Sequence, residues 1–243
     1  MPNRTPRTAM VLAAGLGKRM RPITDTIPKP LVPVAGKTLL DWGLDALQAE
    51  DVERAVVNVH YLADQIDAHV SQRVSPRITV SDERRELLDS AGGIVKALPQ
   101  LGDQPFYILN ADTFWLDQSP SSLSRLAALW DDGRMDILLM LASMDDVTGH
   151  SGSTDFLLDG DGRLERAKGD PSGLVYAGAG IVHPRIFDGA DTIPHSLNAY
   201  FDRAIAAGRL HGMVMRGRWI TVGTPDAIAP AEATVAAWRQ QEQ

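Results

Sequence analysis

Cysteine is absent from the 243 residues of this chain, and its absence excludes several kinds of chemistry. The protein has no disulfides, no thiolate nucleophile and no thiolate metal site, as is compatible with a reducing compartment. No apolar run approaches the ~20 residues that cross a bilayer. An excess of positive charge is also missing, since the formal net charge is −7 and the pI about 5.3. Broad attraction to nucleic acid or to an anionic membrane is therefore not expected.

The amino-terminal segment resembles a secretory signal only in part. Two arginines precede the apolar run 9–16, but that run is short, and the cations within 18–21 stand where a small-residue cleavage site is needed. We therefore expect a cytoplasmic protein without a nucleic-acid or membrane partner.

A glycine-rich turn follows the first apolar run, residues 9–14, which has the length and composition of a buried strand. Gly15 and Gly17 lack Cβ atoms, so backbone N–H groups in this turn can approach a ligand closely and hold phosphate oxygens. The guanidinium of Arg19 offers paired donors to phosphate, and Lys29 offers a compact charge held between two prolines. The segment predicts a phosphate-binding loop.

Two common phosphate-binding motifs do not fit this turn. The dinucleotide fingerprint needs a third glycine where the chain has Met20, and the P-loop needs Ser or Thr where it has Arg19. A dinucleotide-binding module is therefore disfavoured. The remaining structural interpretation is a plain turn whose cations only make the surface soluble.

Residues 12–40 fit the pattern LAAGxGxRMxPxTxxxPKPLxPVxGKxLL at every fixed position. This pattern resembles the sugar-phosphate nucleotidyltransferase family, the enzymes that make nucleoside-diphosphate sugars. The resemblance implies that Arg19 holds the β- and γ-phosphates and Lys29 the α-phosphate. It implies further nucleotide contacts from Leu12, Ala13, Ala14, Gly15 and Gly17.

Strands alternate with amphipathic helices in the first half of the chain, which predicts an α/β fold with a doubly wound, mostly parallel, Rossmann-like mixed sheet. Such sheets bind ligands at the carboxyl ends of their strands. We expect strands at 55–59, 77–80, 106–110 and 136–141, and helices after Thr38 and at 61–73, 92–98 and 121–130.

The second half is expected to contain a hairpin with its turn at 159–162, which begins a small antiparallel portion that the resemblance assigns to the sugar. Further elements are expected at 174–182 (strand), 196–207 (helix), 211–220 (strand) and 224–238 (helix). We expect one domain, 1–243, with a nucleotide-binding half (8–141) and a sugar-phosphate-binding half (142–243).

Asn110-Ala111-Asp112 ends a predicted strand and places an acid where an open α/β sheet presents its ligands. Magnesium is usually bound through one or two carboxylates together with substrate phosphates, so a single aspartate is sufficient. The resemblance implies that Asp112 holds Mg²⁺ and that Asn110 lies on the sugar-phosphate side. Taken alone, an aspartate at a strand end is more often a turn or cap residue.

Four further residues are tied to function by the resemblance. Ser90 and Gly92 lie in LDSAGG, which is similar to the family's base-selecting segment, although Ser90 could simply cap a helix. Lys168 is similar to the family lysine that binds the sugar phosphate, but a surface lysine on a hairpin is the commoner case. Gly178 matches a glycine beside the sugar ring.

One position departs from the family pattern. Members usually carry W-x-D-x-G-T, whose aspartate completes the magnesium site, and this chain has Thr221 in its place. Because a hydroxyl is a weaker ligand than a carboxylate, we expect a lower affinity for Mg²⁺.

The resemblance implies attack by a sugar 1-phosphate on the α-phosphorus of a nucleoside triphosphate, with loss of pyrophosphate. Phosphoryl chemistry of this kind needs positioning and charge, not a protein nucleophile. In its short length and in the runs PKPLVPVAGK, KALPQLGDQPF and GIVHPRIF, the chain resembles a branch of this family that serves cell-wall recycling, and this resemblance implies UTP and N-acetylmuramate 1-phosphate as substrates. The alternatives are a mannose or heptose 1-phosphate with GTP, glucose 1-phosphate with dTTP, or a non-catalytic nucleotide-sugar sensor. The chain is expected to be a monomer or a small homo-oligomer.

Overall fold

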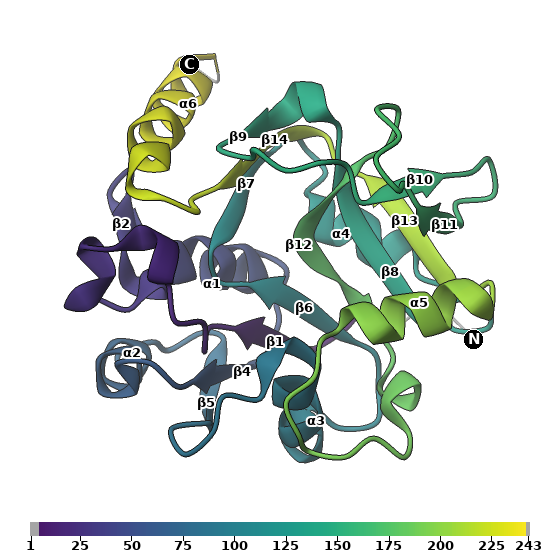
Figure 1. Cartoon of the computed structure of the whole chain (residues 1–243), viewed down its shortest axis with the longest axis horizontal. Coiled ribbons are helices and arrows are strands. Elements are labelled where there is room, and N and C mark those ends of the chain that lie inside the picture. The colour runs from purple at the N-terminus through teal and green to yellow at the C-terminus, as the bar shows by residue number, and fades with distance from the viewer. Residues whose placement is uncertain (1–4, 242–243) are drawn as a thin grey trace.

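A seven-stranded mixed sheet forms the centre of the molecule in the computed structural model, which describes residues 5–241 (Figure 1). The ends of the predicted domain, 1–4 and 242–243, lie outside the described residues. Every pairing in the sheet is parallel except those of β12 with β6 and β8, so the prediction of a mostly parallel mixed sheet is confirmed. In spatial order the strands are β13 (Leu210–Val214), β8 (Ile137–Ala142), β12 (Val175–Val182), β6 (Phe106–Asn110), β1 (Thr8–Leu12), β4 (Arg54–Val59) and β5 (Arg77–Asp82).

Helices cover both faces of this sheet, as a doubly wound fold requires. Buried side chains of α1 (Leu39–Ala49), α2 (Ala63–Val70) and α4 (Ser122–Leu129) join the core on one face. Those of α3 (Asp89–Leu101) and α5 (Asn198–Ala206) join the core on the other. Thr38 caps α1 as predicted, since its side chain accepts a hydrogen bond from the Asp41 amide. No helix within residues 5–241 combines the length and the apolar character that crossing a membrane requires.

A second, three-stranded sheet stands beside the first and corrects one prediction. It consists of β7 (Thr113–Asp117), β14 (Gly217–Thr221) and β9 (Val147–Thr148). The single strand predicted at 211–220 is wrong, because β13 ends at Val214 and β14 belongs to this other sheet. Gly217 makes the change of direction possible: its φ is +126°, and an added Cβ would lie 2.0 Å from the Leu116 carbonyl oxygen.

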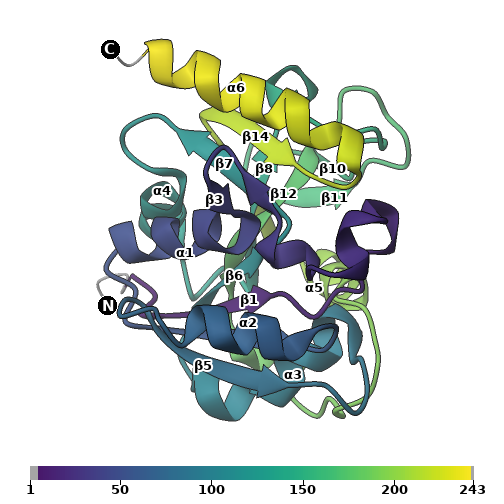
Figure 2. The same cartoon turned by 90° about the vertical axis from the view of Figure 1, so that its left-hand side faces the viewer.

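The amino-terminal hook, residues 13–38, connects β1 to α1 through three short 3-10 turns and the hairpin of β2 (Pro33–Val34) and β3 (Lys37–Thr38). Its apolar side chains pack on the second sheet together with helix α6 (Ile228–Gln241). Figure 2 shows α6 lying across β14 above the hook. The loop is therefore held by a core of its own, which includes Met20, Val32, Val34, Phe114 and Ile220.

The antiparallel hairpin predicted around residues 159–162 is confirmed as β10 (Phe156–Leu158) and β11 (Leu164–Arg166). The glycines inside the 174–182 strand mark a bulge, because the register of β12 with β8 shifts between Tyr176 and Gly180. Several element boundaries differ from expectation, including the starts of two helices. Helix α3 begins at Asp89 rather than at residue 92, and Pro225 opens a 3-10 turn that precedes α6.

Candidate active site

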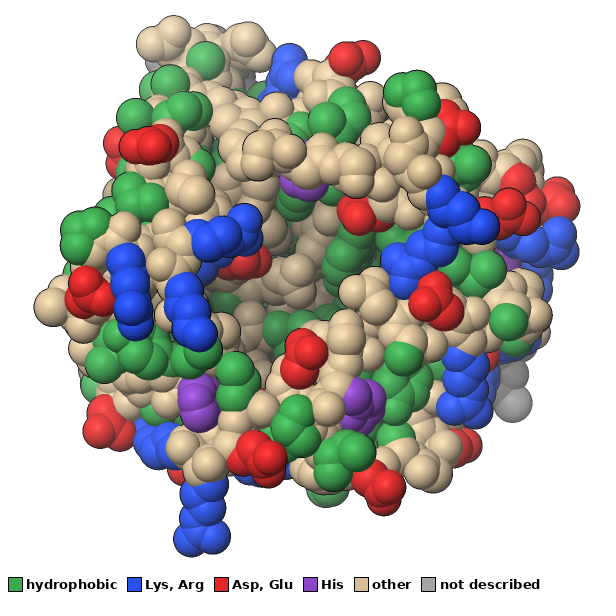
Figure 3. Space-filling model, in the orientation of Figure 1, with side chains coloured by type: hydrophobic (Ala, Val, Ile, Leu, Met, Phe, Trp, Pro, Cys, Tyr) green, Lys and Arg blue, Asp and Glu red, His purple; other side chains and the backbone are tan. Residues whose placement is uncertain are grey.

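A cavity of about 430 Å³ opens at the carboxyl ends of β1, β4 and β6, where a sheet of this kind presents its ligands. The space-filling view shows this face hollowed at its centre (Figure 3). Most of the residues predicted to bind nucleotide or metal lie here, although they are far apart in sequence. The cavity is lined by Leu12, Ala13, Ala14, Gly15, Lys29, Pro30, Asn58, Leu87, Asp89, Ser90, Asn110, Ala111 and Asp112.

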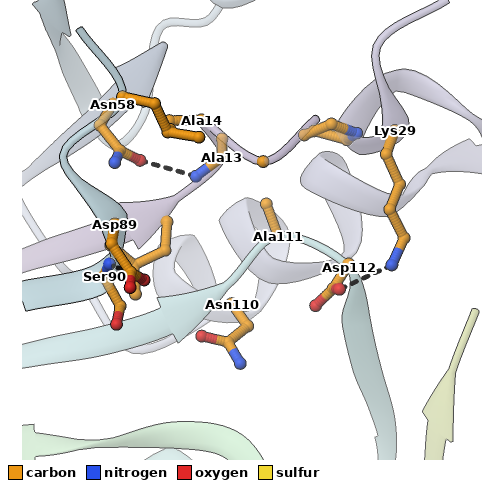
Figure 4. Close-up of a pocket in the computed structure, with 13 residues that line it drawn as sticks. Ala13, Ala14, Lys29, Asn58, Asp89, Ser90, Asn110, Ala111 and Asp112 are labelled. Atoms are coloured by element: carbon orange, nitrogen blue, oxygen red, sulfur yellow. Dashed lines mark hydrogen bonds and ion pairs between the residues drawn. The ribbon is translucent and has the colours of Figure 1, made fainter. Parts of the chain in front are cut away.

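Lys29 and Asp112 form an ion pair on one side of this cavity, with 2.6 Å between Nζ and Oδ2 (Figure 4). The lysine is buried, at 8% exposure, whereas the aspartate side chain is 39% exposed. Lys29 opens a 3-10 turn between Pro28 and Pro30, so its backbone geometry is restricted. The chain thus places a cation, which could bind a phosphate, next to a carboxylate, which could bind a metal ion.

The donor set at Asp112 fits a hard divalent cation. Thr221 lies on the strand beside Asp112, because β14 pairs Thr221 with Thr113 and the Val222 amide donates to the Asp112 carbonyl oxygen at 3.3 Å. Within residues 5–241 no group of three or more His, Cys, Asp or Glu side chains could hold a metal. Magnesium needs no such cage, since one carboxylate, substrate phosphates and water suffice.

Glycine is present at positions 15 and 17 of the predicted phosphate turn for two different structural reasons. Gly17 has φ +60°, and an added Cβ would lie 3.0 Å from both Lys29 Cβ and Thr24 Cγ2, so the fold itself requires glycine there. Gly15 lines the cavity, and an added Cβ there would find nothing within 4 Å. The protein alone does not need glycine at position 15, whereas a ligand in the cavity would.

Arg19 lies outside the cavity lining, at the exposed edge of the hook. Its guanidinium nitrogens are 3.6 Å from the position that a Cβ on Gly223 would take. Within the described part of the chain it has no ion-pair partner, so its charge is available to a ligand. The structure therefore places Arg19 between the hook and the end of β14.

The wall formed by residues 87–90 differs in detail from the prediction. Ser90 lines the cavity, but it does not cap α3: the helix begins at Asp89, and the Ser90 hydroxyl accepts a hydrogen bond from the Leu197 amide at 2.9 Å. Gly92 is not among the residues that line the cavity. Its amide donates to the His195 carbonyl oxygen at 3.3 Å, and an added Cβ would lie 2.2 Å from the carbonyl oxygen of Ile193.

Of the three residues predicted to bind the sugar phosphate, two lie together at the cavity and one does not. Asn110 lines the cavity, and Gly178 lies against it, since a Cβ on this glycine would be 3.2 Å from Asn110 Cβ and 2.5 Å from Thr113 Oγ1. Gly178 has φ +72° at the bulge of β12. Lys168 is exposed in the turn after β11 and does not line the cavity.

The sequence analysis missed one polar residue of this cavity. Asn58 is 2% exposed, and its side-chain oxygen accepts a hydrogen bond from the Ala13 amide at 2.7 Å (Figure 4). Its signal in the sequence is a single amide inside the apolar run 55–59, in a strand buried on both faces. Such a residue must find hydrogen-bond partners, and one partner of Asn58 is the amide of Ala13, a residue that lines the cavity.

The fold and the cavity together define an α/β protein with a candidate ligand site at the carboxyl ends of its parallel strands. Residues 8–148 match the protein-family model described as nucleotidyl transferase. The chain is 45% identical over 240 residues to the N-acetylmuramate alpha-1-phosphate uridylyltransferase of Caulobacter vibrioides, covering 96% of this chain and 99% of that protein. The Neisseria meningitidis serogroup B enzyme of the same name is 33% identical, covering 95% of this chain and 99% of that protein.

Solved structures agree on the fold. The inositol-1-phosphate CTP transferase of T. maritima superposes with a TM-score of 0.80 at 18% identity, covering 98% of each chain. A UDP-glucose pyrophosphorylase complexed with UDP-glucose gives 0.75 at 17% identity, covering 97% of this chain and 99% of that one. The chain belongs to the nucleotidyl transferase family. Members of this family generally use a divalent metal, and its relatives act on nucleoside triphosphates and sugar 1-phosphates.

Proposed function

We propose that this protein couples UTP to N-acetylmuramate 1-phosphate, giving the UDP-sugar and pyrophosphate. Relatives that carry this activity in their names align with this chain from end to end, at 45% and 33% identity. The observation that carries the proposal is the Lys29–Asp112 pair, 2.6 Å apart, beside the glycine turn that ends β1.

In the proposed reaction an oxygen of the sugar 1-phosphate attacks the α-phosphorus of the triphosphate. The bond from the α-phosphorus to the oxygen that bridges it to the β-phosphorus breaks, and pyrophosphate leaves with that oxygen. The backbone around Gly15 would donate to phosphate oxygens, Lys29 would stabilise charge at the α-phosphate, and Arg19 would hold the departing phosphates. Positioning and charge stabilisation account for such a reaction without a protein nucleophile.

We propose Mg²⁺ as the metal and Asp112 as its protein carboxylate, with Thr221 beside it. When bound, Mg²⁺ would neutralise phosphate charge in the cavity. The loss of the family aspartate at position 221 supports the expectation of weaker metal binding, because affinity in oxygen-ligand sites follows ligand charge.

On the sugar side we propose contacts from Asn110 and from the backbone at Gly178, which lie together beside the cavity. Lys168 lies outside the cavity lining, and its contact with the sugar phosphate is a further part of this proposal. We further propose that the chain is one domain, acts in the cytoplasm and is a monomer or a small homo-oligomer.

A guanylyltransferase is the second candidate. The probable mannose-1-phosphate guanylyltransferase 2 of Arabidopsis thaliana is 28% identical, covering 89% of this chain and 62% of that protein. The more distant third candidate, a nucleotide-sugar sensor without turnover, is motivated by Thr221.

Pyrophosphate release separates these candidates. The purified chain is incubated with Mg²⁺ and each pairing of UTP, GTP, CTP or dTTP with N-acetylmuramate, mannose or glucose 1-phosphate. We expect the fastest release from UTP with N-acetylmuramate 1-phosphate, and very little from an Asp112→Asn control. Faster release from GTP with mannose 1-phosphate would favour the second candidate. Nucleotide binding without release from any pairing would favour the sensor.

A further inference from the structure

Two buried polar side chains, Asn58 and Glu83, connect opposite walls of the cavity through consecutive hydrogen bonds. The Ala13 amide donates to Asn58 Oδ1 at 2.7 Å, and Asn58 Nδ2 donates to Glu83 Oε1 at 2.7 Å. The Leu88 amide then donates to Glu83 Oε2 at 3.0 Å. The exposure of Asn58 is 2% and that of Glu83 is 1%, so water does not share these bonds.

Glu83 is a buried carboxylate whose partners are all neutral. Within the described part of the chain no cation lies in ion-pair range of it, and both of its oxygens accept from neutral N–H groups. A buried charge is costly unless it is hydrogen-bonded, and hydrogen bonds to a charged acceptor are stronger than neutral ones. Its backbone is fixed too, because the Glu83 amide donates to the Val59 carbonyl oxygen at 2.8 Å.

The helix that covers this pair leaves room for it. A Cβ on Gly93 of α3 would lie 2.6 Å from Glu83 Oε1 and 2.8 Å from Asn58 Nδ2. The absence of a side chain at position 93 therefore lets α3 pack directly on the two polar groups. The arrangement is a closely packed link, with no space for alternative side-chain positions.

The link joins two segments that are 75 positions apart in sequence (88 − 13) and that both border the cavity. Ala13 belongs to the end of β1 beside the glycine turn, and Leu88 lies between the lining residues Leu87 and Asp89. The link therefore fixes the distance between these two borders of the cavity. Figure 4 shows Asn58 at one end of the cavity, above Asp89 and Ser90 and away from the Lys29–Asp112 pair.

We propose that Asn58 and Glu83 are positioning residues for the nucleotide base: they set the width of the slot between the Ala13 and Leu88 walls, and through it the nucleotide affinity and the base preference. This inference rests on the proposed function, which brings a nucleotide to this cavity. Because the pair lies away from Lys29 and Asp112, it is expected to act on nucleotide binding and not on the phosphoryl step.

Exchange of the polar groups tests the link. Asn58→Asp brings a second carboxylate against Glu83 and removes the donor between them. Glu83→Gln places an amide N–H₂ against either the Asn58 amide or the Leu88 amide. The double variant Asn58→Asp/Glu83→Gln reverses the middle bond: the new carboxylate accepts from Ala13 and from the new amide, whose oxygen accepts from Leu88. Every hydrogen bond and the net charge are then restored.

We expect each single variant to raise the KM and the calorimetric Kd for the nucleotide about tenfold to a hundredfold, the range that an unpaired buried group produces. The kcat and the KM for the sugar 1-phosphate should stay within about twofold, and the preference for the favoured base should fall. The double variant should return the nucleotide KM to within about threefold of the wild type. Thr8→Val is the matched control, since it removes a buried hydrogen bond at the other end of β1 and should leave the nucleotide KM unchanged.

An unchanged nucleotide KM in folded single variants would overturn the inference, as would a folded double variant that binds nucleotide as poorly as the singles. If the single variants do not fold, Glu83→Asp replaces them: it keeps the charge, shortens the link by one methylene and is expected to raise the nucleotide KM at an unchanged Tm. An unchanged KM there overturns the inference as well. Calorimetric binding does not need turnover, so a wild type that binds nucleotide and releases no pyrophosphate would contradict the proposed function alone.

Discussion

At the residue scale, the Lys29–Asp112 pair brings together the two groups that the proposed reaction needs, a cation for the α-phosphate and a carboxylate for the metal ion. Lys29 is almost fully buried, and its ammonium lies 2.6 Å from the Asp112 carboxylate. A buried ammonium is costly without a partner, so the carboxylate holds it in place before any phosphate arrives. Arg19, by contrast, is exposed, with its guanidinium against Gly223. One cation is thus held within the site and the other at its edge.

Loss of either cation is expected to reduce turnover sharply. Arg19→Ala and Lys29→Ala should each lower kcat ~10²–10³-fold, as removal of one preorganised donor to developing charge does elsewhere. Pyrophosphate release measures the effect, and circular dichroism checks that the variants fold. Arg239→Ala, which removes an exposed cation from α6, is the control and should keep wild-type turnover. Near-normal turnover of the Lys29 variant would contradict the assigned role.

The substitution at position 221 gives a second prediction at this scale. Thr221→Asp adds a carboxylate on the strand beside Asp112 and should tighten divalent-ion binding about tenfold or more, because such sites are tuned by ligand charge. Calorimetric titration with Mn²⁺ and the Mg²⁺ dependence of the rate both measure it. Thr221→Asn is the neutral control. Equal metal affinity in the two variants would show that the missing carboxylate has no effect.

At the element scale, the amino-terminal hook explains how a loop of glycines and prolines holds charged groups in fixed positions. The hook packs its apolar side chains against β7, β14 and α6, and it ties its own turns together through the bond from Thr24 Oγ1 to the Gly17 carbonyl oxygen, 2.8 Å long. The turn that carries Lys29 is consequently part of a small core. Its geometry is set by packing before a ligand binds, which reduces the entropy lost on binding.

Gly15 and Gly17 of the hook should respond differently to alanine. Gly17→Ala should lower the free energy of unfolding by about 1–2 kcal/mol, because its φ of +60° is unfavourable for other residues. Gly15→Ala should change stability by less than about 0.5 kcal/mol, since the new methyl group enters open space. It should nevertheless weaken nucleotide binding about tenfold or more by separating backbone donors from phosphate.

Urea unfolding and nucleotide calorimetry on the two variants measure these effects. A destabilised Gly15→Ala protein, or one that binds nucleotide as the wild type does, would contradict the view that this glycine serves the ligand and not the fold.

At the scale of the whole molecule, strands of both predicted halves join one sheet, and a charged cluster ties three of them together at the edge opposite the cavity. Asp136 precedes β8, Arg209 precedes β13 and Arg185 follows β12. The Asp136 carboxylate lies 2.6 Å from Arg185 Nε and 3.0 Å from Arg209 Nε. This cluster links the segments on either side of residue 141, in agreement with the proposal of a single domain.

The cluster predicts a loss of stability in acid. Burial alone would raise the pKa of Asp136, but hydrogen bonds from Arg185 and Arg209 outweigh burial and hold this pKa below its usual value of 3.8. A carboxyl with a depressed folded-state pKa contributes stability above its unfolded value, and this contribution is lost as pH falls through the folded value. Stability should therefore decrease from about pH 4 downward.

Chemical unfolding of the wild type and of Asp136→Asn between pH 7 and pH 3 measures this contribution. The variant should be less stable at pH 7, and the difference between the two proteins should shrink toward pH 3. A difference that stays constant over this range would show that the ionised carboxylate of Asp136 is not what stabilises the sheet edge.

The sequence by itself determined the alternating α/β pattern, the glycine turn with Gly15, the lysine between two prolines at Lys29, and the acid that follows β6. Each of these features depends on residues that are close together in the chain, because hydrophobic periodicity, helix capping and turn formation involve only a few neighbouring positions. The fold class, the family and the hairpin at 159–162 follow from such local patterns, and the structure and the comparisons confirm them.

Only the tertiary structure decided the features that depend on distant neighbours. The run 211–220 is apolar enough for one strand, yet pairing with β7 divides it between two sheets. Gly92 lies in a segment typical of base recognition, yet its space is occupied by the carbonyl oxygen of Ile193. Asn58 finds Glu83 and Ala13 only when three strand ends meet. The packing of helices and strands decides which buried groups contact each other. A local sequence pattern does not predict that packing.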